Sequence, residues 1–299
     1  MLKQASLFPQ ESQSINPKQI INVAQVKQLS PFRYPGGKTW LAPHVKTWLG
    51  NLKIKPALFV EPFAGGGIIS LTVAYEDLSD QIIMVEIDED VSSVWRTIFE
   101  GDAEWLVERI MAFNMTFENV QNCLNTCPNA LKERAFQTIL RNRISHGGIL
   151  AQGAGVMKNG ENGKGLASRW YPATLKSRIE QITKLKGRIK FIQGDGLEII
   201  NQYANETNAV FFIDPPYTAG KKSAGRRLYT HFDLDHPELF TLASTIQGDF
   251  LMTYENADEV KTLASEHGFE YAPISMQNRH NAVQKELLVS RALSWLEYR

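Results

Sequence analysis

One short turn carries a carboxylate, a rigid backbone and an aromatic ring, in Asp214-Pro215-Pro216-Tyr217. The Asp214 carboxylate and the Pro215 carbonyl both accept hydrogen bonds, so together they could hold both hydrogens of a planar exocyclic amine. These two hydrogen bonds would free the nitrogen lone pair for attack. Tyr217 offers a ring face on which a flat base could stack. The same residue types also close strands as plain proline turns, so the interpretation depends on the rest of the chain.

The residues before this turn predict a buried strand. Residues 210–213 form an unbroken apolar run, which suits a strand covered on both faces. The two prolines then end the strand, because neither can donate a backbone N–H to a sheet. We therefore expect Asp214 and Tyr217 at the carboxyl end of a strand, where open α/β sheets bind their ligands.

A second turn carries glycines that could admit a ligand. Residues 59–67 read FVEPFAGGG, and we expect a buried strand over 57–60 and a helix over 68–75. The spacing is that of neither a dinucleotide fingerprint nor a phosphate loop, so we expect a ligand with an amino acid and a nucleoside but no pyrophosphate. The predicted cofactor contacts on this turn are Glu61, Pro62, Phe63, Ala64, Gly65 and Gly67.

Acidic residues follow two further predicted strands. Glu86 and Ile87 come after a strand over 82–85, and an acid about 20 residues past the glycines could accept from both ribose hydroxyls. Asp195 and Gly196 follow a strand over 188–192, and this acid could accept from the amino group of a bound adenine ring. All four residues are predicted to contact the cofactor.

We expect the turn Tyr34-Pro35-Gly36-Gly37-Lys38 to form part of the edge of the same cofactor pocket. Its glycines leave a tight, bare backbone that a ligand can approach closely. We expect Tyr34 and Lys38 to touch a charged ligand. The alternative is a turn that only starts the amphipathic helix after it.

The middle of the chain is basic, although the formal net charge is zero over 299 residues. Acids dominate residues 76–118, whereas lysines and arginines dominate residues 128–190, the kind of field that attracts phosphates. We expect helices over about 103–145 and then a glycine-rich, basic segment over 141–170, which is functional or else a solvated flexible loop. The predicted phosphate and base contacts, here and in the basic stretch after the catalytic turn, are Arg141, Arg143, Ser145, Lys158, Lys164, Arg169, Trp170, Arg226, Arg227 and Tyr229.

Other features bear on partners and location. Residues 1–30 are expected to form a loosely held tail, in which Gln4-Ala5-Ser6-Leu7-Phe8 is similar to the peptide that docks bacterial replication proteins on the sliding clamp. Cys123 and Cys127 have no Cys or His cluster nearby, so we expect free thiols and no metal site. No signal peptide or apolar run of membrane length is visible, and we expect a cytoplasmic protein without a membrane partner.

Three blocks in this order resemble the Dam-type (alpha-group) DNA adenine N6-methyltransferases: YPGGK at 34–38, EPFAGGG at 61–67 and DPPY at 214–217. The resemblance runs from about residue 31 to the end of the chain. It implies an α/β, Rossmann-like, S-adenosylmethionine-dependent methyltransferase fold with a mixed, mostly parallel sheet. The catalytic domain would occupy 31–100 and 188–299, and a helical, basic target-recognition insert would occupy 101–187.

The resemblance also implies methyl transfer from S-adenosylmethionine to N6 of a flipped-out adenine in double-stranded DNA. By position in the motifs, Tyr34, Lys38, Glu86 and Asp214 match the cofactor contacts of the family. Two features depart from it: the ribose-binding acid is usually Asp and is Glu here, and 141–170 is unlike the short recognition hairpin of Dam itself, so a GATC target is not implied. The alternatives are a cytosine-N4 or an RNA adenine methyltransferase, or a DNA-binding relative that has lost catalysis.

Overall fold

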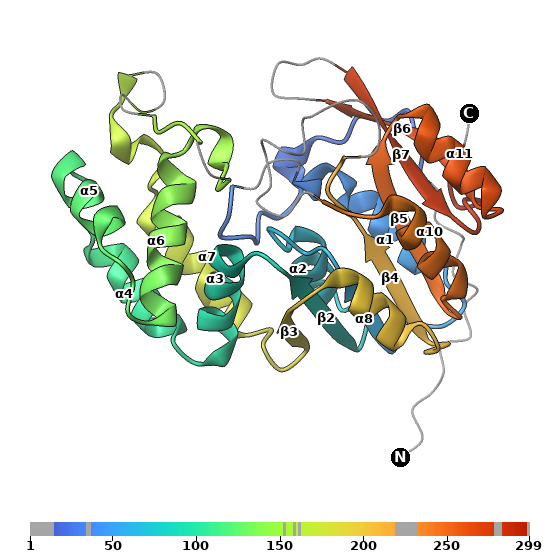
Figure 1. The fold of residues 1–299 in the computed structure, drawn as a ribbon, viewed down its shortest axis with the longest axis horizontal. Helices are drawn as coiled ribbons and strands as arrows, with labels where there is room; N and C mark the ends of the chain where they lie inside the picture. Colours follow the sequence, from blue (N-terminus) through green and yellow to red (C-terminus); the bar gives the residue numbers. More distant parts are fainter. Residues whose placement is uncertain are drawn as a thin grey trace.

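A computed structural model gives the structure of the chain over residues 15–33, 37–151, 154–157, 160, 163–218, 233–277 and 283–297 (Figure 1). Within these ranges the chain builds one mixed sheet with helices on both faces and a group of helices beyond one end of it. None of the described helices is both long and apolar enough to cross a membrane.

The sheet confirms the predicted mixed, mostly parallel α/β class. Its strands are β1 (Leu58–Glu61), β2 (Gln81–Glu86), β3 (Ile189–Gln193), β4 (Ala209–Ile213), β5 (Asp249–Glu255), β6 (Glu270–Gln277) and β7 (Val283–Ser290). They lie in the order β3-β2-β1-β4-β5-β7-β6. Strands β1 to β5 are parallel, and β7 runs antiparallel to both of its neighbours. The order reverses between β1 and β4, which makes the gap beyond their carboxyl ends the topological switch point.

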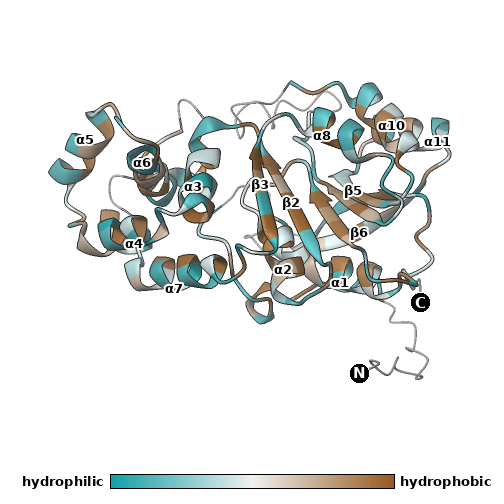
Figure 2. Cartoon of the chain, turned by 90° about the horizontal axis from the view of Figure 1, so that it is seen from below, coloured by the Kyte–Doolittle hydropathy of each residue, from teal (hydrophilic) through white to brown (hydrophobic). Residues whose placement is uncertain are grey.

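Helices cover both faces of the sheet (Figures 1 and 2). One face is covered by α1 (Ala42–Gly50) and α2 (Ile68–Tyr75), the other by α8 (Gly196–Tyr203), α10 (His236–Thr245) and α11 (Asp258–Glu266). Strand β4 shows why two cores form: side chains alternate along a strand, so Phe212 joins the core under α2 while Phe211 joins the core under α10. All five residues of β4 are buried, as its unbroken apolar run predicted.

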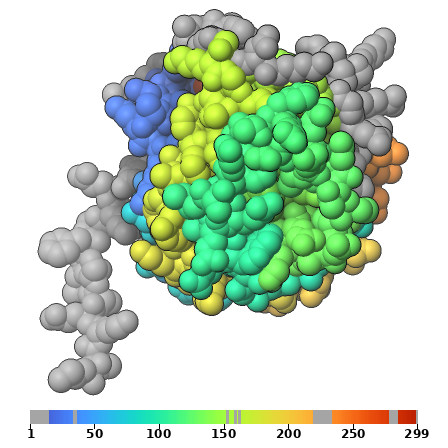
Figure 3. Space-filling model, turned by 90° about the vertical axis from the view of Figure 1, so that its left-hand side faces the viewer, coloured from blue at the N-terminus to red at the C-terminus, as the bar shows by residue number. Residues whose placement is uncertain are grey.

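The remaining helices form the end of the molecule that faces the viewer in Figure 3. This helical end consists of α3 (Glu89–Glu100), α4 (Ala103–Ala112), α5 (Phe117–Asn125), α6 (Leu131–Ile144) and α7 (Pro172–Thr183). All the described strands lie outside 101–187, but α3 packs against α6 and one continuous apolar cluster joins these helices to the sheet. The division into a catalytic domain and an insert at residue 101 therefore stays a prediction.

Residues 15–30 of the predicted tail belong to the described part of the chain, and some of them contact the rest of the protein. Ile15 forms a bridge with Leu296, and the Ser275 N–H donates to the Pro17 carbonyl at 2.9 Å. Leu29 is buried in the core. Backbone pairing thus ties Ile15 and Pro17 to the C-terminal part of the chain, and a loose tail stays a prediction for the other residues before Leu29.

Two elements have only weak signals in the sequence. Helix α8 is only eight residues long and starts directly after Asp195, whose carboxylate caps it. Strand β6 contains Pro273, which weakens its strand pattern. Pro273 is tolerated because β6 is the outer strand of the sheet.

The tight turn between α10 and β5 generates a test of the packing. A Cβ on Gly248 would lie 1.9 Å from the Ala209 carbonyl oxygen, so backbone must move to admit it. We expect Gly248→Ala to lower the free energy of unfolding by roughly 2–4 kcal/mol. Urea denaturation checks this against Gly187→Ala, whose Cβ would meet nothing within 4 Å and whose stability should stay near wild type. Equal losses in the two variants would contradict the prediction.

Candidate active site

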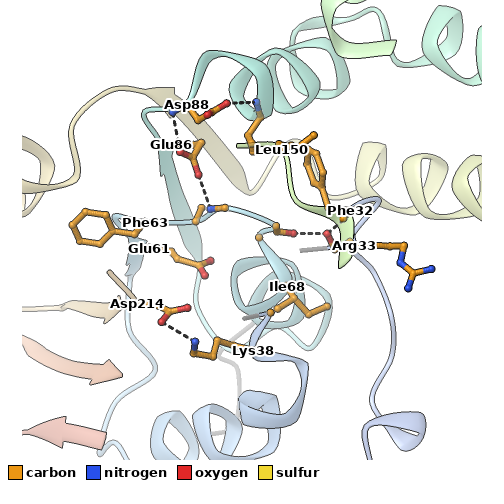
Figure 4. Close-up of a pocket in the computed structure, with 18 of the residues that line it drawn as sticks. Phe32, Arg33, Lys38, Glu61, Phe63, Ile68, Glu86, Asp88, Leu150 and Asp214 are labelled. Carbon is orange, nitrogen blue, oxygen red and sulfur yellow. Dashed lines mark hydrogen bonds and ion pairs between the residues drawn. The ribbon is translucent and has the colours of Figure 1, made fainter. Parts of the chain in front are cut away.

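A cavity of about 720 Å³ opens at the carboxyl ends of β1, β2, β3 and β4. Acids from all four strand ends line it, namely Glu61, Glu86, Asp195 and Asp214, together with Lys38. Figure 4 shows Glu61, Glu86 and Asp214 directed into this region from neighbouring strands. The topology thus unites the residues that the sequence placed after four separate strands.

The glycine turn forms a cradle between β1 and α2. Gly67 has a left-handed φ of +63°, and a Cβ there would lie 2.5 Å from the end of Met84, so only glycine fits. The Gly65 N–H donates to Glu86 at 2.9 Å, and the Gly65 carbonyl accepts from the Trp95 indole at 2.9 Å. The backbone of the turn is therefore held open toward the cavity.

Glu86 ends β2 with both carboxylate oxygens engaged. Oε2 accepts from Gly65 N–H and Oε1 accepts from Asp88 N–H, each at 2.9 Å (Figure 4). Burial raises the pKa of Glu86 to about 7. Each carboxylate oxygen can accept a second hydrogen bond, so the fixed Glu86 can still take two hydroxyl donors.

Glu61 ends β1 and is buried more deeply. Its Oε2 accepts from the Ser70 N–H at 2.9 Å, in the first turn of α2. Burial raises the pKa of Glu61 to about 8, and the nearby Asp214 and Glu86 carboxylates add to the rise. The ionised form of Glu61 is therefore unfavourable in this buried position unless a cation binds nearby.

The third strand end carries Asp195 and Gly196. Asp195 Oδ1 accepts from Leu197 N–H at 2.7 Å and caps α8. A Cβ on Gly196 would lie 2.6 Å from the Pro62 carbonyl oxygen, so this glycine lets the two strand-end turns touch. Ile87 is exposed, and it lines the cavity beside them.

The Asp214–Tyr217 turn, which the sequence predicts to be catalytic, is held by residues from distant strands. Asp214 Oδ1 lies 3.0 Å from Lys38 Nζ and accepts from the Thr253 hydroxyl at 2.6 Å. The Tyr217 hydroxyl donates to Glu286 at 2.8 Å and lies 3.2 Å from the Thr253 hydroxyl. Burial, together with the Glu286 and Asp214 carboxylates, raises the pKa of Tyr217 well above its usual value.

The ring of Tyr217 is half-buried and stacks on Tyr254, with centroids 6.1 Å apart. Tyr254 is held in turn by His236, whose other ring nitrogen lies 2.9 Å from the Thr218 hydroxyl. Pro216 lines the cavity and Pro215 is buried. Stacking of a base on Tyr217 stays a prediction.

Thr253 and Glu286 were missed in the sequence. Thr253 lies on β5 and Glu286 on β7, and neither belongs to a recognisable motif. The available signal was a charged or polar residue inside an apolar strand, as in the run KELLVS around Glu286. Such a residue in a buried strand needs a partner, and here the partner is the catalytic turn.

Four of the predicted phosphate and base contacts are buried and do not present their side chains to solvent: Arg143, Ser145, Arg169 and Trp170. Arg143 donates to the Pro31 carbonyl, and burial lowers its pKa to about 9. Trp170 packs against Phe113 and Phe136. All four side chains thus have positions inside the protein in this conformation, and their contact with nucleic acid stays a prediction.

The remaining predicted contacts divide into two groups. Arg141 is half-buried and pairs with Asp90 at 2.6 Å, whereas Lys164 is exposed. The other predicted residues lie outside the described part of the chain: Tyr34, Pro35, Gly36, Lys158, Arg226, Arg227, Tyr229 and the segment Gln4 to Phe8. Tyr171, Thr174 and Arg178 of the helical end line the cavity opposite the glycine turn.

The strand order, the glycine turn and the acid at the end of β2 define a doubly wound, Rossmann-like α/β protein. Residues 34–279 match the D12 class N6 adenine-specific DNA methyltransferases, and the chain belongs to this family. It is an adenine-specific DNA methyltransferase, as the three sequence blocks predicted.

The chain is similar to one known protein in sequence and more distantly to a solved structure. The Type II methyltransferase M.MjaIII of Methanocaldococcus jannaschii is 24% identical over 238 residues, which cover 72% of this chain and 78% of that protein. The rRNA methyltransferase aviRa of Streptomyces viridochromogenes superposes with a TM-score of 0.37 and 12% identity, covering 87% of each chain.

The raised pKa of Glu61 generates a test of the buried acids. The unfolded carboxyl titrates near 4.5 and the folded one near 8, so the folded state holds the proton more tightly and its stability falls as the pH rises between these values. Glu61→Gln keeps an acceptor for Ser70 N–H but cannot ionise. The difference in free energy of unfolding, Glu61→Gln minus wild type, should therefore rise by at least about 1 kcal/mol from pH 5 to pH 8.5. The scale follows because one pKa unit corresponds to about 1.4 kcal/mol. Urea denaturation at both pH values measures this, and a pH-independent difference would contradict it.

Proposed function

We propose that this protein transfers the methyl group of S-adenosylmethionine to N6 of an adenine that is flipped out of duplex DNA. The observation that carries the proposal is the Asp214 carboxylate, held at the cavity wall by Lys38 and Thr253 across from the glycine turn. A carboxylate next to a proline backbone carbonyl suits an exocyclic amine, which has two hydrogens to donate.

The residues of the cavity fit the proposed cofactor. A volume of about 720 Å³ is within the range of small-molecule sites. The buried Glu61 and Glu86 have raised pKa values, so a ligand with an ammonium and a sulfonium group would favour their ionised forms. When bound, S-adenosylmethionine supplies an electrophilic methyl group on a positively charged sulfur.

Each strand end then has a separate binding role. Glu86 accepts from the two ribose hydroxyls, because its carboxylate is fixed by backbone N–H groups and retains acceptor capacity. Asp195 uses Oδ1 for the α8 cap and offers Oδ2 to the adenine amino group of the cofactor. Glu61 and the bare backbone at Gly65 receive the amino-acid part.

The amine of the target base is oriented by the catalytic turn. Asp214 and the Pro215 carbonyl accept its two N–H bonds, which directs the nitrogen lone pair away from the turn. The lone pair forms the new N–C bond, and the C–S bond breaks with its electron pair passing to sulfur. The nitrogen becomes acidic only after methylation, so Asp214 accepts the proton last.

Duplex DNA must be opened for this reaction, because a base inside the stack cannot reach the cavity. The lining of the cavity includes Asp214 and Pro216 of the proposed catalytic turn together with Tyr171 and Arg178 of the helical end. Tyr171 is exposed, so it offers a ring to a base or sugar near the flipped nucleotide. The family match favours DNA adenine over the cytosine-N4 and RNA alternatives.

Replacing Asp214 tests the role of the catalytic turn. Asp214→Asn keeps the shape but removes the charge and puts N–H donors where an acceptor is needed. We expect methyl transfer to fall at least about 100-fold, the scale seen when one preorganised polar group is lost. The measurement is transfer of labelled methyl from S-adenosylmethionine to unmethylated genomic DNA, followed by nucleoside analysis. Label in N4-methylcytosine, no label in the DNA, or an active Asp214→Asn variant would contradict the proposal.

Replacing Glu86 tests the cofactor site separately. Glu86→Gln loses a charged acceptor for the ribose hydroxyls, and we expect the Kd for S-adenosylmethionine to rise about 10-fold or more. Titration calorimetry without DNA measures this. Glu198→Gln is the control, because Glu198 is exposed on α8, and its Kd should match wild type. An unchanged Kd for Glu86→Gln would place the ribose elsewhere.

A further inference from the structure

Glu286 is a buried carboxylate that the steps above do not use. It lies on β7, where its side chain is 13% exposed. Its Oε2 accepts from the Tyr217 hydroxyl at 2.8 Å and lies 3.7 Å from Lys38 Nζ. Both of these partners also contact the catalytic Asp214 or belong to its turn.

Lys38 is shared between two carboxylates. Its ammonium lies 3.0 Å from Asp214 and 3.7 Å from Glu286, and its side chain is 5% exposed. With Asp214 alone, this buried ammonium would cancel the charge of the carboxylate that faces the substrate. With Glu286 present, the three ionised groups carry a net charge of −1. Lys38 then cannot neutralise both carboxylates, so part of the negative charge remains on Asp214.

Two hydroxyl groups lie between Glu286 and Asp214. The Tyr217 hydroxyl donates to Glu286 at 2.8 Å, the Thr253 hydroxyl donates to Asp214 at 2.6 Å, and the two hydroxyl oxygens are 3.2 Å apart. Thr253 is fully buried, so little water competes for these bonds. Each carboxylate thus has a hydroxyl donor of its own, and Lys38 is the cation that both of them share.

We propose that Glu286 is a positioning residue for methyl transfer: it balances the charge of Lys38, so that Asp214 presents a negative charge to the amine of the target base. The inference rests on the proposed role of Asp214. It concerns a residue on β7, far along the chain from the three sequence blocks.

The reaction needs this balance at two points. As the N–C bond forms and the C–S bond breaks, positive charge moves from sulfur to N6, and a net negative cluster stabilises it there. The proton then passes from N6 to the Asp214 carboxylate, so the cluster goes from −1 to zero. Without the Glu286 charge the same steps would take the cluster from zero to +1 inside a buried site, which is unfavourable.

The surroundings of Glu286 define how it titrates. Lys38 faces it from the 3-10 helix Lys38–Leu41, Asp214 and Tyr217 from the turn after β4, and Glu255 from the register position opposite on β5. Burial raises the pKa of Glu286, while Lys38 opposes the rise. The active form is ionised, so activity should be lost as the pH falls through this raised pKa.

The test is Glu286→Gln, which keeps an acceptor for Tyr217 and removes only the charge. We expect the single-turnover rate of methyl transfer, at saturating S-adenosylmethionine and DNA, to fall about 10- to 100-fold. The Kd values for both should change less than about threefold. Asp249→Asn is the matched control. It removes the charge of a half-buried carboxylate at the first residue of β5, and this variant should turn over at the wild-type rate.

Two further readouts separate charge from shape. Glu286→Asp keeps the charge and should recover most of the rate, and the acid limb of the pH–rate profile should flatten in Glu286→Gln alone. A wild-type rate in Glu286→Gln, or a Glu286→Asp variant as slow as Glu286→Gln, would overturn the inference. If Asp214→Asn is inactive while Glu286→Gln is normal, only this inference fails; if Asp214→Asn is active, the proposed function fails with it.

Discussion

The site depends on how a protein can bury several carboxylates within one cavity. Each acid at a strand end accepts a backbone N–H from the turn or helix that follows: Ser70 N–H for Glu61, Gly65 and Asp88 N–H for Glu86, and Leu197 N–H for Asp195. The strand–turn–helix unit supplies these donors wherever it occurs, because the first N–H groups of a helix have no partner within it. The fold therefore satisfies the acids without neutralising them, and the cavity retains a preference for a cationic ligand.

Asp214 is the exception, since side chains satisfy it instead of a helix start. The two prolines after it leave no N–H groups nearby, so Lys38 and Thr253 take the place of backbone donors. This makes the Asp214 carboxylate sensitive to the groups behind it, Tyr217 and Glu286 among them. The proposed role of Asp214, to accept from a substrate amine, fits this arrangement, because its partners can set its charge.

The helical end contributes to the cavity by a different route from the one that its composition suggested. Arg143 and Arg178 donate to the carbonyls of Pro31 and Ser30, and Asn142 bonds both the N–H and the carbonyl of Arg33. These bonds join the helical end to the N-terminal lip of the cavity. Basic residues in this segment therefore act partly as structural ties, whereas exposed ones such as Lys164 remain available to phosphate.

The sequence by itself determined the strands β1 to β4 and the acids at their ends, because apolar runs, glycines and prolines act locally. It also determined the family, through three short blocks in a given order. Only the tertiary structure decided which basic residues are buried, as with Arg143 and Arg169, because burial depends on packing between elements that are distant in sequence. It also decided that Thr253 and Glu286 stand behind the catalytic turn. Strand pairing across the sheet brings them there, and no local pattern in the chain encodes which strands become neighbours.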